Sequence, residues 1–468
     1  MKSAGVFMPT CFHHAVTLRM LPWLSNSPIR VIHDATGSVK DTRLAAFIAA
    51  AFLAGWPAGA AAVPQLKYVV IVTRHGVRSP TANAARLDQY SAAPWPEWEV
   101  PPGNLTPLGR TLIGLMGSYY RDWLSAERLL RPNGCQDAQH IYIWADKDQR
   151  TLETGRAFAE SLLPGCGVPI HSQSEGGTDP LFSGAGTPDP ERSLNAVRER
   201  LGPDPQKLLA SHRAALDVLQ SILNGPVASE RVIQPATAIG VSIKGRSVQL
   251  NGPFAVGSTL SENLLLEYAD GMKGAALGWG RLTRENLNRV LELHAAYADL
   301  MRRTPYLARA RGSNLLAHVL RSIEQAASGM PTPGALGQPG DGVLLLSGHD
   351  TNLSNLSGML GLSWSLPGYQ PDDTPPGGAL IFSLWRDPEA GHYFVKLRYV
   401  AQTLDQMRNL VPLSIANPPA SQDVSIPGCE AAEPGNGCPW ETARSIMQKA
   451  IAPQFTSINP RAPSPGAR

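Results

Sequence analysis

The chain has 468 residues, of which 43% are hydrophobic and 17% are charged, so it can bury a sizeable core in one large domain or two coupled domains. This composition excludes an intrinsically disordered chain. Lys and Arg total 41 against 38 Asp and Glu, a formal charge of +3, and no long run of one sign predicts a nucleic-acid or membrane-surface partner. Any anion-binding chemistry must therefore come from a few placed residues.

Residues 1–62 are interpreted as an upstream segment followed by a signal peptide. Lys40 and Arg43 precede the apolar run LAAFIAAAFLAGW, and the small residues of PAGAAA follow it, so we expect cleavage near Ala62. The run is short, Ala-rich and interrupted by Pro57, which disfavours a stable membrane anchor. We therefore expect a periplasmic or secreted mature protein.

An α/β domain is predicted on both sides of a helical insert. Near-continuous apolar runs are typical of strands in a buried, mostly parallel sheet. Thr106 is a predicted N-cap with Pro107 at the first helical position, opening a helix to about Leu130, and a second helix is expected from Asp148 to about Leu163. The expected strands are 67–76, 140–148, 342–350, 379–385 and 393–400.

The middle of the chain lacks most of this strand signal. Residues 176–335 have mainly helical spacing, with one short hairpin expected in VSIKGRSVQL. We therefore predict an α/β catalytic domain made of 63–175 and 336–468, with flanking helices, and a mainly helical domain inserted between its halves.

Four cysteines remain after the predicted cleavage, an even number that fits two disulfides in an oxidising compartment. Spacing alone cannot separate the three pairings. We favour joining sequence neighbours, because they close small loops. No Cys-x-x-Cys spacing occurs, which disfavours zinc. The favoured bridges are Cys135 with Cys166 and Cys429 with Cys438.

Three predicted strands end in charged or catalytic residue types. In open α/β sheets, ligands bind outside the carboxyl ends of the strands, so we expect these side chains to converge on one site. Arg78 lies just beyond the first strand and joins them. The strand-end residues are Arg74 and His75, then Asp146 and Arg150, then His349 and Asp350.

These residue types predict chemistry on a phosphoryl group. Arginine forks match phosphate oxygens and stay charged at any relevant pH. Neighbouring cations should lower the pKa of His75 and keep its imidazole neutral and nucleophilic. Asp350 could then protonate the leaving oxygen, His349 could hydrogen-bond a phosphate oxygen, and Gly76 would let the backbone pass close to the ligand.

The motifs RHGVRSP at 74–80 and GHDTN at 348–352 match the signatures of the histidine acid phosphatases. The order of LTPLGR, ADKDQRT and TPPGGALIF around them resembles the bacterial periplasmic branch, which contains phytases and glucose-1-phosphatases. The resemblance covers nearly the whole predicted mature chain. It implies a phosphoglycerate mutase-like α/β fold with a helical domain over its mouth, and no metal or other cofactor.

The resemblance also implies roles for individual residues. His75 would become the phosphohistidine and Asp350 would be the proton donor. Thr81 matches a threonine at the pocket edge, and Thr351 belongs to the second motif. Phosphate would be bound by Arg74, Arg78, Arg150 and His349.

Four further residues carry open alternatives. By looser matching, Glu262 and Arg311 align with rim positions of the helical domain, and we otherwise expect them to be ordinary helix-surface charges. Asp146 is either a carboxylate on the substrate side or a partner that holds an arginine in the fold. Asp148 is interpreted as the N-cap of the following helix, with a catalytic role as the alternative.

The predicted function is that of an exported acid phosphatase working through a phosphohistidine. Phytate or a related small phosphate ester is the expected substrate, although Ala82 stands where the family's phytases commonly have lysine. The alternatives are a glucose-1-phosphatase or broad sugar-phosphate phosphatase and, more remotely, a catalytically silent secreted phosphate-binding protein. We expect a monomer, with a dimer as the alternative, and no nucleic-acid partner.

Overall fold

The computed structural model describes residues 63–173, 177–225, 240–244, 247–429 and 437–458. The chain divides after Ala61, and every described residue belongs to the unit that begins at Ala62. The predicted signal peptide lies outside the described residues. Within the described ranges, no helix is both long and apolar enough to span a membrane.

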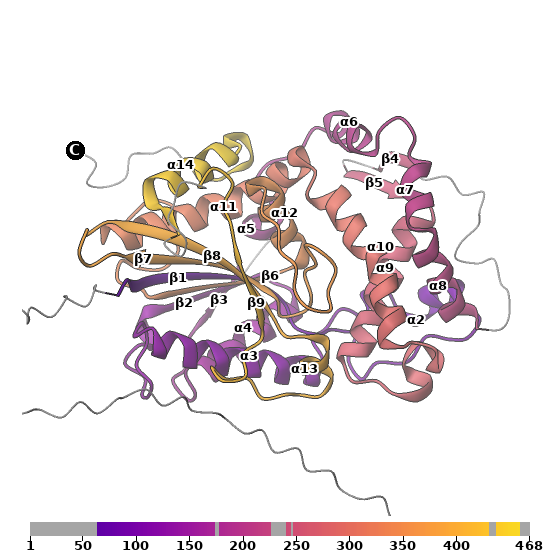
Figure 1. The fold of residues 1–468 in the computed structure, drawn as a ribbon, viewed down its shortest axis with the longest axis horizontal. Coiled ribbons are helices and arrows are strands. Elements are labelled where there is room, and N and C mark those ends of the chain that lie inside the picture. The colour runs from indigo at the N-terminus through magenta and orange to yellow at the C-terminus, as the bar shows by residue number, and fades with distance from the viewer. Residues whose placement is uncertain (1–62, 174–176, 226–239, 245–246, 430–436, 459–468) are drawn as a thin grey trace, which may run out of the picture. The chain divides into compact units, whose positions relative to one another are not determined.

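An eight-stranded mixed sheet forms the centre of the α/β part (Figure 1). Its order is β10-β8-β7-β1-β6-β2-β3, with β9 paired to β8. Strands β1, β6, β2 and β3 are parallel neighbours, and β7 is antiparallel to both β1 and β8. The predicted α/β class with a mostly parallel sheet is confirmed. The strands are β1 (Gln65–Arg74), β2 (Ile141–Ala145), β3 (Ile170–His171), β6 (Val343–Gly348), β7 (Ala379–Arg386), β8 (Tyr393–Ala401), β9 (Ala420–Val424) and β10 (Cys438–Pro439).

Helices cover both faces of this sheet. On one face α3 (Pro107–Ala126) and α4 (Gln149–Leu162) pack together, and on the other lie α11 (Pro305–Ser328), α12 (Asp350–Leu360) and α14 (Trp440–Ala450) (Figure 1). Along β1, Val69 and Ile71 belong to the α3–α4 core, whereas Val70 and Val72 belong to the core on the opposite face. Because both faces are buried, the strand is a continuous apolar run rather than an alternating one.

The helix starts predicted from capping residues are correct. The Thr106 hydroxyl accepts a hydrogen bond from the Gly109 N–H at 2.9 Å, with Pro107 at the first helical position. The helix ends at Ala126, four residues earlier than expected. Arg128, just beyond, has a left-handed backbone with φ of 60°, which a continuing helix does not allow.

The middle of the chain is mainly helical, and the predicted hairpin is present. Helix α10 packs against α9 and α8 and also reaches α12 of the α/β part. Helix α11, which falls inside the predicted insert, packs on β1, α12 and α14, and the domain boundaries stay a prediction. The elements are α5 (Pro180–Ser183), α6 (Pro190–Leu201), α7 (Gln206–Ser211), α8 (Arg213–Asn224), β4 (Gly240–Lys244), β5 (Ser247–Asn251), α9 (Pro253–Ala269) and α10 (Arg284–Arg302), with short helices α2 (Ala84–Leu87) and α13 (Leu404–Arg408) elsewhere.

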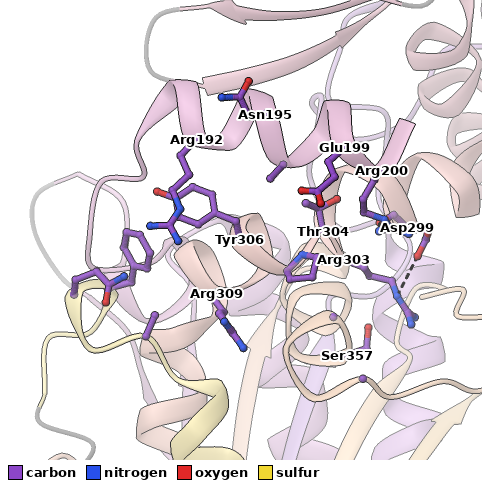
Figure 2. Close-up of a pocket in the computed structure, with 17 residues that line it drawn as sticks. Arg192, Asn195, Glu199, Arg200, Asp299, Arg303, Thr304, Tyr306, Arg309 and Ser357 are labelled. Atoms are coloured by element: carbon purple, nitrogen blue, oxygen red, sulfur yellow. Dashed lines mark hydrogen bonds and ion pairs between the residues drawn. The ribbon is translucent and has the colours of Figure 1, made fainter. Parts of the chain in front are cut away.

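A cavity of about 790 Å³ lies between α6, the start of α11 and the end of α12 (Figure 2). The segment 452–455 closes another side of it. None of the strand-end residues singled out in the sequence lines this cavity, so it is separate from the site predicted at the sheet.

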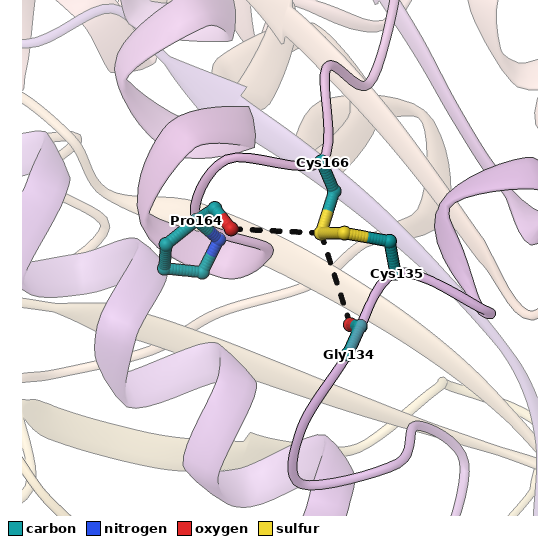
Figure 3. Close-up of a disulfide and its surroundings, with 4 residues drawn as sticks. All are labelled: Gly134, Cys135, Pro164 and Cys166. Atoms are coloured by element: carbon teal, nitrogen blue, oxygen red, sulfur yellow. Dashed lines mark hydrogen bonds between the residues drawn. A yellow bond between two sulfur atoms is a disulfide. The ribbon is translucent and has the colours of Figure 1, made fainter.

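Two disulfides join the pairs favoured from the sequence, Cys135 with Cys166 and Cys429 with Cys438. The first spans 31 residues and encloses both β2 and α4 (Figure 3). Cross-linking a loop of this length stabilises a fold by about 3 to 5 kcal/mol in the chain-entropy description. It therefore braces the unit formed by β2 and α4, which carries Asp146 after the strand and Arg150 in the helix.

Candidate active site

The carboxyl ends of three adjacent parallel strands bring the predicted residues together. Arg74 ends β1 and is paired in register with Gly348, the last residue of β6. Ala145, at the end of β2, pairs with Ser347 of β6, so the residues after each strand emerge at one edge. The rings of His75 and His349 lie edge to face with centroids 5.6 Å apart.

His75 is buried and held as one tautomer. Its Nδ1 lies 2.8 Å from the Gly76 carbonyl oxygen, and because a carbonyl only accepts, Nδ1 must carry the hydrogen. The lone pair is then on Nε2. Burial, followed by the positive charges of Arg74 and Arg78, lowers the pKa of His75 well below its usual value. The sequence predicted that neighbouring cations would lower this pKa, but burial lowers it more than they do.

Glu262 is the shared partner of two site arginines. Arg74 donates to the Thr374 carbonyl at 2.6 Å and pairs with Glu262, whose same oxygen lies 3.3 Å from Arg78. Burial alone would raise the pKa of Glu262, but Arg78 and Arg74 lower it to about 2. Glu262 is only 9% exposed, so the expectation of an ordinary helix-surface charge was wrong.

Three arginines of the site have buried donors without a hydrogen-bond partner. The Nε–H groups of Arg74, Arg78 and Arg150 are buried, and none has a hydrogen-bond acceptor among the described residues. A buried donor without an acceptor is costly by about 1 to 3 kcal/mol. Three such guanidinium donors near one nucleophilic imidazole fit an anionic, oxygen-rich ligand.

Asp350 is held as a carboxylate by groups on two helices. One of its oxygens lies 2.6 Å from Arg302 at the end of α10, and the other accepts from the Thr351 N–H at 2.7 Å. His294 Nε2 lies 3.8 Å away. Burial by itself would raise the pKa of Asp350, but Arg302, then Arg74 and His294, hold it well below its usual value.

His349 and Asp146 form a second pair at the site. His349 Nε2 lies 2.7 Å from an Asp146 carboxylate oxygen, so the partner of Asp146 is a histidine. Of the two expected roles, holding an arginine is not the one that the structure shows. Although burial opposes it, the hydrogen bond from His349 lowers the pKa of Asp146. This contact uses Nε2 of His349 and leaves Nδ1 for other partners.

Asp148 occupies the N-cap position of α4 but makes no side-chain cap hydrogen bond. Its carboxylate instead pairs with Arg150 at 2.5 Å. The interpretation as an N-cap is therefore right about position and wrong about what the side chain does. The contact joins two opposite charges, whereas a cap would join the carboxylate to a neutral backbone N–H.

Comparison with known proteins agrees with this geometry. The model of the histidine phosphatase superfamily (branch 2) matches residues 65–226 and 259–400. The chain belongs to this superfamily. It is 35% identical over 413 residues to phytase AppA of Escherichia coli (strain K12), covering 83% of this chain and 93% of that protein.

Two further relatives of this histidine phosphatase extend the comparison. Glucose-1-phosphatase of Salmonella typhimurium is 29% identical over 429 residues, which is 88% of this chain and all of that protein. The solved Hafnia alvei phytase in complex with myo-inositol hexakis sulphate has a TM-score of 0.77 and 37% identity, covering 86% of this chain and 100% of that chain.

The remaining predicted residues of this histidine phosphatase differ in their placement. An added Cβ at Gly103 would lie 3.6 Å from both Thr81 and Arg150, so Thr81 sits beside the arginine cluster. Arg311 is exposed on α11 next to Gly184 and shares none of the contacts that join the cluster. Gly76 is tightly packed, since an added Cβ would lie 2.8 Å from a side-chain carbon of Ile113, and its expected role beside the ligand stays a prediction.

Sequence reasoning missed Arg302 and His294. Both lie on α10, more than 45 residues before Asp350, and neither belongs to a motif. Only the fold brings α10 against α12. The one available signal was the double arginine at 302–303, which is typical of an ordinary helix end.

Proposed function

We propose that this histidine phosphatase is an exported acid phosphatase that hydrolyses phosphomonoesters through a phosphohistidine at His75. Two observations carry the proposal together: the Nε–H groups of Arg74, Arg78 and Arg150 are buried and unpartnered, and the charges of these arginines act on His75, whose Nδ1 is held by Gly76. Guanidinium donors fit the charge on phosphoryl oxygens, and a neutral imidazole is the nucleophile that phosphoryl transfer requires.

In the first step, the Nε2 lone pair forms a bond to phosphorus and the ester P–O bond breaks. The arginine donors stabilise the charge on the phosphoryl oxygens in the transition state. The leaving oxygen takes a proton from Asp350. In the second step, water attacks the phosphohistidine, the P–N bond breaks, and Asp350 receives the proton that the water loses.

The proton on Asp350 needs a source, because Arg302 keeps this carboxylate ionised in the free protein. Phosphate bound in the arginine cluster adds negative charge beside Asp350, which raises the pKa of this carboxyl. We propose that Asp350 therefore takes up a proton from acidic solution once the ester is bound. The protein works best in acid, where Asp350 is protonated in this complex and His75 is still neutral.

Phytate is the proposed substrate, and glucose 1-phosphate is the alternative. The similarity to phytases at 35% and 37% identity supports the first. The similarity to a glucose-1-phosphatase over 88% of the chain supports the second. Ala82, which packs partly buried against the core, adds no charge for a further phosphate and favours the smaller substrate.

Phosphate release from purified mature protein at pH 3 to 7 in EDTA tests this proposal. We expect turnover of phytate, glucose 1-phosphate and p-nitrophenyl phosphate, with phytate preferred. Preference for glucose 1-phosphate would assign the protein to the sugar-phosphatase alternative. No release from any of the three would contradict the proposed enzyme and favour a binding protein.

Export to the periplasm and a monomeric state are further parts of the proposal. Two disulfides are typical of an oxidising compartment, and the apolar run before Ala62 supports secretion. Mass spectrometry of the exported protein would identify its N-terminus, expected near Val63. Light scattering would measure the molar mass of the protein in solution, which is expected to be that of a monomer.

Arg302→Gln is expected to move the alkaline limb of the pH–rate profile to higher pH. In the native protein Arg302 lowers the pKa of Asp350, so its removal raises that pKa and keeps the proton donor protonated at higher pH. We expect a shift of about one unit for glucose 1-phosphate, with little change for p-nitrophenyl phosphate. Arg302→Lys should restore most of the native profile.

Arg303→Gln is the matched control, since Arg303 pairs with Asp372 at 2.8 Å rather than with Asp350. Its pH profile should coincide with the native one. An unchanged pH–rate profile in Arg302→Gln would contradict the role of Arg302 in setting the pKa of Asp350.

A further inference from the structure

We infer that the cavity between α6, α11 and α12 is a second, non-catalytic site for a multiply charged phosphate or sulfate ester. Four arginines and two carboxylates are among the residues that line it. The arginines are Arg192, Arg200, Arg303 and Arg309, and the carboxylates are those of Glu199 and Asp299. The cavity is therefore positively charged in a protein whose overall charge is nearly balanced.

The length of helix α12 separates this site from the catalytic one. Asp350 is the first residue of α12, whereas Ser357 and Gly358 in its last turns line the cavity. At a rise of about 1.5 Å per residue, seven residues separate the two by about 10 Å. No residue of the catalytic cluster is among the described residues that line this cavity.

Two of the four arginines are already neutralised. Arg200 contacts the Asp299 carboxylate at 2.6 Å, and Arg303 contacts Asp299 at 3.4 Å and Asp372 at 2.8 Å. These pairs fix one wall of the cavity. In Figure 2 they lie apart from Arg192 and Arg309.

Arg192 and Arg309 have no carboxylate partner among the described residues. Arg192 instead stacks over the Tyr306 ring at 4.6 Å, and Phe455 meets the same ring edge to face at 6.0 Å. The Tyr306 hydroxyl accepts from the Asp189 N–H at 3.0 Å, which fixes the ring. Two free guanidinium groups beside a fixed aromatic wall fit an ester with anionic groups on a compact body.

The start of α11 adds to the positive potential. This 24-residue helix begins at Pro305, and no side chain caps it, since the Thr304 hydroxyl donates back to the Leu300 carbonyl. Thr304, Pro305 and Tyr306 all line the cavity. An uncapped helix N-terminus favours an anion there, in addition to the arginines.

A ligand in this site would connect α6 with the beginning of α11 and the end of α12. Such a bridge stabilises the folded protein by an amount that grows with the logarithm of ligand concentration above the Kd. It leaves the chemistry at His75 unchanged, because the two sites share no residue.

Calorimetric titration with myo-inositol hexakis sulphate at low ionic strength tests this inference without turnover, because the probe is not a phosphate ester. We expect two bound molecules per native chain. The double variant Arg192→Gln/Arg309→Gln should bind one, with affinity at the lost site reduced about tenfold or more per arginine. Its turnover of p-nitrophenyl phosphate should stay native.

The double variant Arg128→Gln/Arg386→Gln is the control for net charge. Both arginines are exposed and lie outside either site, so this variant should still bind two molecules. A single site in the native chain, or two in Arg192→Gln/Arg309→Gln, would overturn the inference. Inorganic sulfate should bind the second site much more weakly, and equal affinity would overturn the assignment to an ester.

Discussion

His75→Ala is expected to lower kcat by about 10⁴-fold or more, since it removes the nitrogen that is proposed to attack phosphorus. The Nε2 lone pair is free only because Nδ1 donates to the Gly76 carbonyl. The substitution removes that single hydrogen bond and the edge contact with His349. The melting temperature should therefore stay close to the native value.

The direct measurement for His75 is rapid quench in alkali after mixing with a phosphorus-labelled ester. Phosphohistidine survives alkali, so the native protein should retain label and His75→Ala should retain none. His140→Ala, which removes an exposed histidine, is the control and should behave as native. Labelled protein or substantial turnover in His75→Ala would rule out His75 as the nucleophile.

Asp350→Asn is expected to slow release of poor leaving groups by about 10² to 10⁴-fold. A sugar alkoxide needs a proton as its bond to phosphorus breaks, whereas p-nitrophenolate needs almost none. The loss with glucose 1-phosphate should therefore be much larger than with p-nitrophenyl phosphate. Asparagine keeps the shape of the side chain, which matters because Arg302 lies 2.6 Å away.

Asp350→Ala should show the same pattern with reduced stability, because the partly buried Arg302 loses its partner, at a cost of at most about 3 to 5 kcal/mol. Asp372→Asn is the matched control, since Asp372 pairs with Arg303 but lies outside the catalytic cluster. Equal losses for both leaving groups in Asp350→Asn would argue against a proton donor. Melting temperatures separate that result from misfolding.

The sequence predicted the strand-end residues because local patterns decide them. A strand buried on both faces is a continuous apolar run, and the residue after it must emerge at the edge of the sheet. Arg74, His75, Asp146 and His349 are therefore brought together as expected. The Thr106 cap follows from equally local chemistry.

What the sequence left open depends on contacts between distant segments. Glu262 joins Arg74 across 188 positions, and the Arg302–Asp350 pair spans 48. Periodicity describes which face of a helix is apolar but not which helix it meets. Asp148 shows the same limit at short range, because the nearby Arg150 draws its carboxylate away from the helix end.

The reacting groups and the charged residues around them lie on different segments, which has a consequence for redesign. The groups proposed to make and break bonds follow β1 and β6. Arg302 and His294, which lower the pKa of Asp350, lie on α10, and Glu262, which pairs with Arg74, lies on α9. A chimera that exchanges only α9 and α10 with those of a relative should keep its nucleophile and acquire a different working pH. The working pH and the nucleophile are thus encoded by separate stretches of the gene.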